Sequence, residues 1–230
     1  MNDKQREIRS FVRRPGRMTP AQRQALEQLS DTYLLDYSDQ AVAPADLFGR
    51  AAPLLLEIGF GNGDSLVELA AAEREWNVLG IEVHEPGIGH CLLVAEKAEL
   101  SHFRVIMHDA IEVLREQLPA HCVDRINVYF PDPWPKKRHH KRRLLAPKFL
   151  DLAVRVLKPN GHLHIATDWA NYAEHIDELM ASDSRFTLET RVQHDGSEPL
   201  MRPQTKFERR GMRLGHEIVD WRFQVLNKVD

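Results

Sequence analysis

From residue 53 onward, short apolar runs alternate with longer stretches in which apolar and polar positions recur at helical spacing. Short continuous runs are typical of buried parallel strands, and amphipathic stretches of 10–15 residues are typical of helices that cover them. We expect strands at about 54–58, 77–83, 103–107, 123–130, 162–167, 185–191 and 217–226. We expect helices at about 64–73, 85–100, 110–117, 146–157 and 169–182. This alternation predicts an α/β, Rossmann-like fold with a mostly parallel sheet covered on both faces.

The chain before residue 53 follows a different pattern. Thr19 and Pro20 mark a helix start, with Thr19 as N-cap and Pro20 in the first turn, and this helix is expected to run to about Ser30. The preceding residues are basic and contain few large apolar groups. The expected organisation is a mobile basic N-terminal arm at 1–17, a helix and connection at 18–52, and the main domain at 53–230.

The turn after the first expected strand, EIGFGNGD at 57–64, is rich in glycine, which permits a tight turn and close approach of a ligand. Glu82 ends the next strand, at a spacing that suits a carboxylate accepting the hydroxyls of a ribose. A dinucleotide fingerprint requires glycine where Asp64 stands, and Glu57 and Asp64 would both repel a diphosphate. S-adenosylmethionine carries an ammonium and a sulfonium, so it fits these acids better than NAD does. The alternative is that residues 57–64 form an ordinary glycine-rich turn that binds no ligand.

Two further strand ends carry carboxylates. Asp109 suits either a hydrogen bond from an adenine amino group or the N-cap of the next helix, and spacing does not choose between them. Asp132 stands between Pro131 and Pro133 in a stiff segment, followed by Trp134, which suits stacking on a base. The alternative is a rigid surface connection with Trp134 packed into the core.

The charge of the chain is unevenly distributed. The formal net charge is −3, yet residues 136–143, here called the basic segment, hold six Lys or Arg and no acid. A run at the ligand-binding edge of a sheet favours contact with phosphates of RNA, although many charge runs are solvated surface. His139 and His140 have no acids or cysteines nearby, so we expect no metal site.

Other functional classes are disfavoured. Cys91 and Cys122 form no C-x-x-C pair, no apolar run approaches the roughly 18 residues of a membrane span, and the N-terminus has no secretory h-region. A cytoplasmic protein with no membrane partner is therefore expected. The sequence does not set the oligomeric state, and a monomer is compatible with it.

The motifs together resemble those of the bacterial tRNA (guanine-N7-)-methyltransferase family over roughly residues 15–228. The resemblance rests on LEIGFGNG at 56–63, GIEVH at 80–84, HDA at 108–110, YFPDPWPKKRHHKRR at 129–143, ATDW at 166–169 and TKFERRG at 205–211. It implies a class I S-adenosylmethionine-dependent methyltransferase with a seven-stranded sheet whose last strand is antiparallel. It also implies transfer of a methyl group to guanine N7 in the variable loop of tRNA, at position 46 by tRNA convention.

The resemblance also implies roles for individual residues. The cofactor site comprises Glu57, Gly59, Gly61, Gly63, Glu82, Asp109 and Asp132, and Asp132 is also catalytic. The target nucleoside is held by Lys136, Asp168, Thr205, Lys206, Phe207 and Glu208. RNA is contacted by Arg138, His139, His140, Lys141, Arg142 and Arg143. Asp168 and Glu208 fit the catalytic role of Asp132 equally well by sequence alone, and Asp168 also suits a helix cap.

Three rival functions remain at this point. A methyltransferase acting on an amino group has a related Pro/Asp/aromatic motif, but there an aromatic does not directly follow Asp-Pro as Trp134 does here. An RNA-binding protein with a degenerate cofactor fold is disfavoured by the acids at the strand ends. A nicotinamide dehydrogenase is disfavoured by Asp64 and by the lack of a partner for hydride transfer.

Overall fold

A computed structural model describes residues 10–11, 16–195 and 202–226 of the chain. Its strands are β1 Leu34–Leu35, β2 Leu54–Ile58, β3 Asn77–Ile81, β4 Phe103–Ile106, β5 Val123–Tyr129, β6 Leu157–Thr167, β7 Phe186–His194 and β8 Ile218–Val225. Its α-helices are α1 Pro20–Tyr33, α2 Pro44–Phe48, α3 Asp64–Ala72, α4 Glu85–Lys97, α5 Ala110–Glu112, α6 Pro147–Val156, α7 Ala170–Ala181 and α8 Lys206–Arg213. A π-helix, η1, covers Val113–Gln117, and a 3-10 helix, η2, covers Lys137–Arg142.

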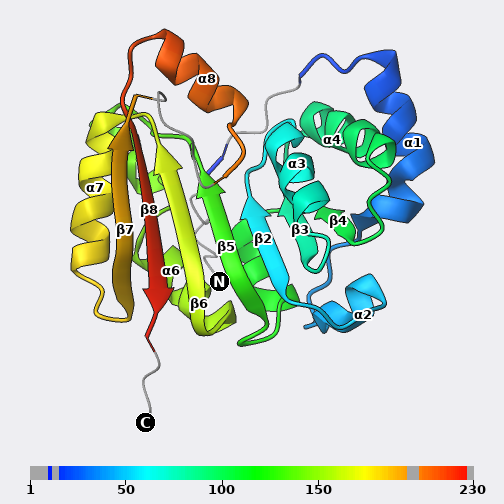
Figure 1. The fold of residues 1–230 in the computed structure, drawn as a ribbon, viewed down its shortest axis with the longest axis horizontal. Helices are drawn as coiled ribbons and strands as arrows, with labels where there is room; N and C mark the ends of the chain where they lie inside the picture. The colour runs from blue at the N-terminus through cyan, green and yellow to red at the C-terminus, as the bar shows by residue number, and fades with distance from the viewer. Residues whose placement is uncertain (1–9, 12–15, 196–201, 227–230) are drawn as a thin grey trace, which may run out of the picture.

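The described strands form one sheet in the order β1-β4-β3-β2-β5-β6-β8-β7 (Figure 1). Strands β1 to β6 pair in parallel, whereas β8 runs antiparallel to both β6 and β7. The predicted seven strands with an antiparallel last strand are therefore confirmed. The eighth, the two-residue β1, comes from the chain before residue 53 and extends the sheet beside β4.

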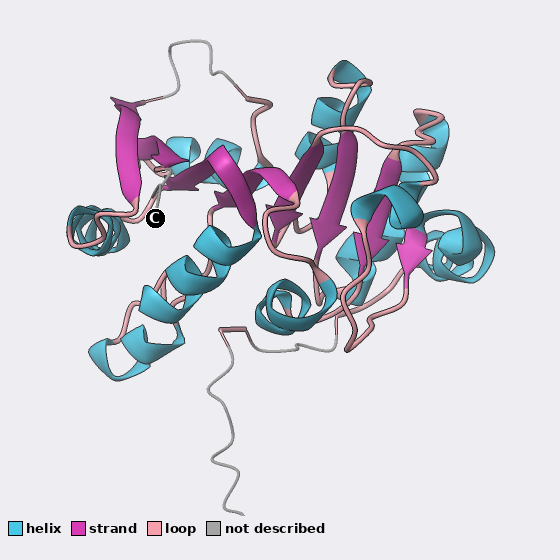
Figure 2. Cartoon of the chain, turned by 90° about the horizontal axis from the view of Figure 1, so that it is seen from below, coloured by secondary structure: helices cyan, strands magenta, loops and turns pink. Residues whose placement is uncertain are grey.

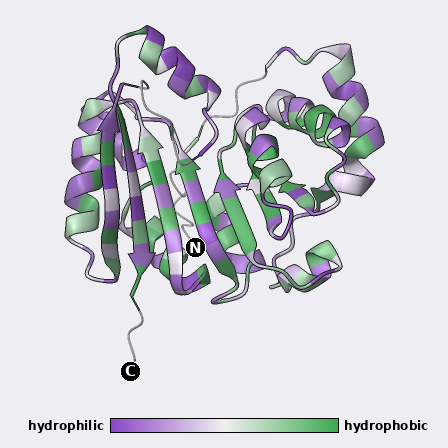
Figure 3. Cartoon of the chain, in the orientation of Figure 1, coloured by the Kyte–Doolittle hydropathy of each residue, from purple (hydrophilic) through white to green (hydrophobic). Residues whose placement is uncertain are grey.

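Strand β2 shows how the sheet is covered on both faces. Its side chains alternate between faces, as in any strand. Leu54, Leu56 and Ile58 pack into a core with α6 and α7, while Leu55 packs into a second core with α1, α3 and α4. Figure 2 shows helices on both sides of the sheet, and Figure 3 shows the hydrophobic colouring of its central strands. A strand buried on both faces reads as a continuous apolar run, which is why it could be predicted.

Besides β1, the short α2 and the division of the helix expected at 110–117 into α5 and η1, two elements differ from expectation. Helix α8 was not predicted, because its sequence KFERRGMR has no apolar periodicity and reads as an exposed turn. Strand β6 begins at Leu157, so it includes residues 158–161, where we expected a turn. The strand accommodates these residues by a shift in its register with β5 and by a left-handed backbone conformation at Asn160 (φ 63°). Both exceptions depend on contacts that lie far away in sequence.

Helix α1 begins as predicted, with Thr19 and Gln22 forming a reciprocal capping box. It lies against α4, where a Cβ at Gly89 would approach the carbonyl oxygen of Gln22 to 2.6 Å. The Tyr33 hydroxyl at its end donates to Glu96 of α4 at 2.9 Å. The division of the chain at residues 17 and 52 stays a prediction, and most of the predicted mobile arm lies outside the described residues.

Within the described ranges, no helix combines the length and apolar character needed to cross a bilayer. The same residues contain no group of three or more His, Cys, Asp or Glu side chains arranged to hold a metal ion.

Candidate active site

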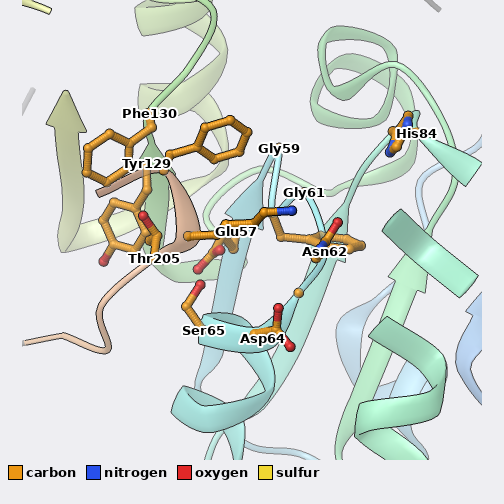
Figure 4. Close-up of a pocket in the computed structure, with 14 residues that line it drawn as sticks. Glu57, Gly59, Gly61, Asn62, Asp64, Ser65, His84, Tyr129, Phe130 and Thr205 are labelled. Atoms are coloured by element: carbon orange, nitrogen blue, oxygen red, sulfur yellow. The ribbon is translucent and has the colours of Figure 1, made fainter. Parts of the chain in front are cut away.

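A cavity of about 240 Å³ opens at the carboxyl ends of β2 and β5. This is the edge at which ligands bind in parallel α/β sheets. Its walls come from the turn between β2 and α3, the end of β5 and the start of α8. The lining residues are Glu57, Gly59, Phe60, Gly61, Asn62, Gly63, Asp64, Ser65, His84, Tyr129, Phe130, Thr205, Lys206 and Phe207. Figure 4 shows Glu57 between the side chains of Tyr129 and Thr205 and those of the glycine-rich turn.

Glu57 is the most deeply placed acid of this cavity. Only 2% of it is exposed, and burial raises the pKa of its carboxyl to about 7, against the lowering effects of the Asn127 side chain and of the Arg202 charge. Its Oε2 is buried and has no hydrogen-bond partner in the described chain. Asn127 is paired with Glu57 across the β2–β5 ladder, and its amide is near enough to lower the pKa of Glu57. Within the described chain, neither polar atom of its side chain forms a hydrogen bond of good geometry. Because buried polar groups are nearly always hydrogen-bonded, this group fits a polar, cationic ligand.

The three predicted glycines have different structural roles, although all have a positive φ. A Cβ at Gly59 would meet no atom within 4 Å, so this glycine leaves open space beside the backbone. A Cβ at Gly61 would lie 3.5 Å from the Phe207 ring, across the cavity. A Cβ at Gly63 would lie 2.3 Å from Sγ of Cys91, so Gly63 permits α3 and α4 to approach. The structure thus leaves open space at Gly59 and has a packing contact at Gly63, and contact of these glycines with the cofactor stays a prediction.

Two of the three other predicted cofactor acids, Glu82 and Asp109, are engaged with the backbone. Glu82 accepts hydrogen bonds from the N–H groups of Gly61, Val83 and His84, at 2.9, 2.6 and 3.1 Å. It therefore ties the end of β3 to the glycine-rich turn. Asp109 caps α5 by accepting from the Ile111 N–H at 3.0 Å, so its role as a helix cap is confirmed. Contact of either acid with the cofactor stays a prediction.

Asp132 is exposed at the carboxyl end of β5, between two strained residues. Phe130 and Trp134 have φ values of 51° and 46°, in the left-handed region that bulky residues rarely adopt. Each such residue costs about 1–3 kcal/mol and persists where the surrounding structure enforces it, most often at functional sites. The segment is held at both ends, since the Phe130 N–H donates to Ala166 and the Trp134 indole donates to the carbonyl of Ser10 at 3.1 Å.

The basic segment forms η2 and turns most of its cations to solvent. The Arg142 guanidinium lies 5.0 Å above the Trp134 ring. Arg143 differs from the others, because it is 4% exposed and donates to Pro133 at 3.0 Å and to Asn171 at 2.7 Å. We therefore assign Arg143 to fixing the loop, and contact with RNA stays a prediction for the more accessible residues of the segment.

Helix α8 and its N-cap bring three of the six predicted nucleoside-binding residues, Thr205, Lys206 and Phe207, to the cavity wall, whereas Lys136, Asp168 and Glu208 do not line it. Thr205 and Glu208 form a reciprocal capping box, with hydrogen bonds of 3.1 and 3.2 Å. Lys206 and Phe207 line the cavity, and 51% of Phe207 is exposed. Glu208 is fully buried and faces away from solvent. Asp168 receives a 3.1 Å contact from His216, just beyond the helix.

A buried ion cluster holds α8 against the sheet. Arg202 donates to Asp220 of β8 at 2.7 and 2.8 Å, and to Glu208 of α8 at 2.7 Å. His164 and His194 also contact Asp220, each at 3.1 Å. We call these five residues the Arg202 cluster.

The Arg202 cluster is strongly coupled electrostatically. Burial would lower the pKa of Arg202, but Asp220 and Glu208 raise it well above its ordinary value. Burial would likewise raise the pKa of Asp220, but His164 and Arg202 hold it well below its ordinary range. The Arg202 guanidinium also lies 4.9 Å from the Tyr129 ring and 5.5 Å from the Phe130 ring. A single side chain therefore connects α8, β8 and the residues that precede Asp132.

Sequence reasoning missed several of these residues. His84, Tyr129 and Phe130 line the cavity, and Arg202 and Asp220 support it. The position of Tyr129 and Phe130 directly before Pro131 was a usable signal. No signal linked Arg202 to Asp220, because their contact depends on β8 entering the sheet beside β6.

Comparisons with known proteins agree with this architecture. Residues 51–221 match a family model described as a putative methyltransferase. The chain is 51% identical to the tRNA (guanine-N(7)-)-methyltransferase of Halorhodospira halophila over 216 residues, covering 94% of each chain. It is 50% identical to the protein of that name from Shewanella amazonensis over 219 residues, covering 95% of this chain and 92% of the relative. In fold it resembles the 16S rRNA (adenine(1408)-N(1))-methyltransferase of Catenulisporales acidiphilia, with a TM-score of 0.58 and 18% identity over 82% of this chain and 94% of that one.

The sheet order and the antiparallel β8 give the fold of class I S-adenosylmethionine-dependent methyltransferases. The match of residues 51–221 to a methyltransferase family model places the chain in that class. Identity of about half of all residues over nearly the whole chain then decides the family within this class. The chain belongs to the tRNA (guanine-N(7)-)-methyltransferase family.

Proposed function

We propose that this protein transfers the methyl group of S-adenosylmethionine to N7 of a guanine in tRNA, at position 46 of the variable loop. The observation that supports the reaction, and tRNA as its substrate, is the similarity to tRNA (guanine-N(7)-)-methyltransferases. About half of all residues are identical over nearly the whole chain. The position within the tRNA rests on the resemblance of the TKFERRG and PDPWPKKRH motifs. A cytoplasmic location stays the expected one.

The cofactor site fits this donor. Glu57 supplies a buried carboxylate with an unpartnered oxygen, and Gly59 leaves room for a ligand beside the backbone. Asp64, which also lines the cavity, adds a second acid. Two acids attract a cationic ligand and repel a diphosphate. When bound, S-adenosylmethionine supplies an electrophilic methyl group on its sulfonium.

Guanine N7 carries no proton in the neutral nucleoside, so its lone pair can attack without prior deprotonation. The chain's residues then act mainly by positioning the base and by electrostatic stabilisation. Asp132 suits this role because it is exposed, whereas Glu208 is fully buried and paired with Arg202. We assign Asp132 to accept hydrogen bonds from N1–H and the amino group of guanine, which stabilises the positive charge that builds on the ring.

The experiment that tests this function is methyl transfer from labelled S-adenosylmethionine to an unmodified tRNA transcript, followed by nucleoside digestion. We expect 7-methylguanosine from a transcript with guanine at position 46 and none from the same transcript with adenine there. Label in another nucleoside would contradict the reaction. Equal 7-methylguanosine from both transcripts would contradict the position while leaving the reaction in place.

A further inference from the structure

Helix α8 presents four cations to solvent. Lys206, Arg209, Arg210 and Arg213 are all exposed, and Glu208, the acid of this helix, is buried. None of the four forms an ion pair with a carboxylate in the part of the chain that the structure describes. Arginines elsewhere in the chain do have such partners: Arg115 pairs with Glu116, and Arg191 pairs with Asp177. In a chain of net charge −3, this helix is a basic surface that no carboxylate of the described residues neutralises.

Packing does not account for the composition of α8. Its buried residues are Glu208 and Gly211, so it contributes no apolar stripe to the core, and Figure 3 colours it largely purple. A helix that is polar on every side needs another source of stability. Here Glu208 pairs with Arg202 at 2.7 Å, and Gly211 lies so close to Asp168 that a Cβ would approach Oδ2 to 2.7 Å. These contacts hold the buried face of the helix against the rest of the protein and leave its cations exposed to solvent.

The location of α8 connects its cations to the candidate active site. The helix begins at the cavity, where Lys206 and Phe207 form part of the wall, and its eight residues extend about 12 Å from there. The connection from β6 to α7 and the first turn of α7 contact both basic regions of the protein. Asn171 accepts from Arg143 of the basic segment, while Asp168 contacts Gly211 and His216 at the α8 side. The two basic surfaces therefore border the same connection beside the cavity.

We propose that Arg209, Arg210 and Arg213 of α8 form a second phosphate-binding surface for tRNA, separate from the basic segment. This inference rests on the proposed function and names a further part of its substrate site. Arginine guanidinium groups suit phosphate oxygens in charge and geometry, and such contacts orient a nucleic acid without reading its bases. Because both basic surfaces border the segment at 168–171 beside the cavity, the RNA backbone is held at two places near the guanine that enters the cavity.

The test compares two double variants that remove the same charge. Arg210→Gln/Arg213→Gln removes two cations of α8, and Arg74→Gln/Lys97→Gln removes two exposed cations near the starts of β3 and β4, at the opposite edge of the sheet. The dissociation constant for an unmodified tRNA transcript is measured over a series of salt concentrations. We expect the α8 variant to bind more weakly and to lower the slope of log K against log salt by about 2, or about 1 per phosphate contact. The control should retain the wild-type slope.

The kinetic readout separates RNA binding from catalysis. In the α8 variant the KM for tRNA should rise while kcat at saturating tRNA and the affinity for S-adenosylmethionine stay unchanged. Arg210→Glu, a single substitution on the exposed face, should give the same direction of change. An unchanged salt slope in both α8 variants, or an equal fall in the control, would overturn the inference. Failure of the wild-type protein to form 7-methylguanosine would instead overturn the proposed function, so the two outcomes are distinct.

Discussion

The two sides of the cavity, the proposed cofactor side and the proposed side for the acceptor guanine, are built in different ways. On the cofactor side, Glu57 and the glycine-rich turn come from one continuous strand–turn–helix unit of the chain. On the acceptor side, Thr205 and Phe207 belong to the start of α8, which is held by the Arg202 cluster, and this cluster joins residues from three strands and α8. The Arg202 guanidinium also lies over the rings of Tyr129 and Phe130, which precede Asp132 in the chain. Backbone conformation therefore shapes the cofactor side, while buried charge pairs between distant segments shape the acceptor side. Substitutions on the two sides should have different consequences.

The largest effect is expected from breaking the Arg202 cluster. Arg202→Gln leaves Asp220 and Glu208 without their cation and should lower the free energy of unfolding by about 3–5 kcal/mol, measured by denaturant titration. Arg202→Lys keeps the charge but not the forked geometry, so it should fold and show a reduced kcat with an unchanged dissociation constant for S-adenosylmethionine.

Arg185 provides the matched control, since it also contacts two acids, Asp183 and Asp151. It is partly exposed and lies at the start of β7, so Arg185→Gln should cost about 1 kcal/mol or less and leave kcat unchanged. Equal losses of kcat in Arg202→Lys and Arg185→Gln would show that the Arg202 cluster has no special relation to the acceptor side.

The next effect concerns Glu57 and pH. Because burial raises its pKa from 4.5 to about 7, the folded protein binds more protons than the unfolded chain between these values. The free energy of unfolding without ligand should therefore fall by about 3 kcal/mol as pH rises from 4.5 through 7, and Glu57→Gln should remove this fall.

Affinity for S-adenosylmethionine should have the opposite pH dependence, because its cationic groups attract the ionised carboxylate. Calorimetry should show affinity rising by up to about tenfold per pH unit below 7, and this rise should be absent in Glu57→Gln. The exposed Glu68 of α3 provides the control, and Glu68→Gln should retain both pH dependences. A flat affinity in the wild-type protein would exclude Glu57 from the cofactor contact.

Asp132→Asn should lower the rate of methyl transfer by about 100-fold, the scale of losing one preorganised electrostatic contact in a transition state. Binding of tRNA and S-adenosylmethionine should survive, as measured separately from single-turnover rates. Asp46→Asn, on α2, removes an exposed carboxylate and should leave the rate unchanged. Undiminished turnover in Asp132→Asn would remove Asp132 from the mechanism.

The smallest effect compares two capping boxes. Thr19→Ala and Thr205→Ala remove equivalent N-cap side chains from α1 and α8, and each should cost about 1 kcal/mol of stability in thermal unfolding. Only Thr205→Ala should also raise the KM for tRNA, because α8 forms part of the cavity wall. Equal kinetic behaviour of the two variants would mean that the α8 cap has a structural role alone.

Much of the fold was predictable from sequence for a physical reason. Each central strand is buried on both faces and therefore appears as a continuous apolar run such as Leu54–Ile58. The glycine-rich turn was visible because positive φ at Gly59, Gly61 and Gly63 favours one residue type. Helix α8 was not visible, since it is stabilised by an ion pair and a capping box rather than by an apolar stripe.

By itself, the sequence determined the class of the sheet, the place of the cofactor turn and the basic character of the segment at 136–143. These features depend on local conformation or on composition, which neighbouring residues specify. Only the tertiary structure decided that Arg143 is buried, that Gly63 serves packing and that Arg202 joins β8 to α8. Burial and charge pairing arise when distant segments meet, because the free energy of a buried ion depends on every element packed around it.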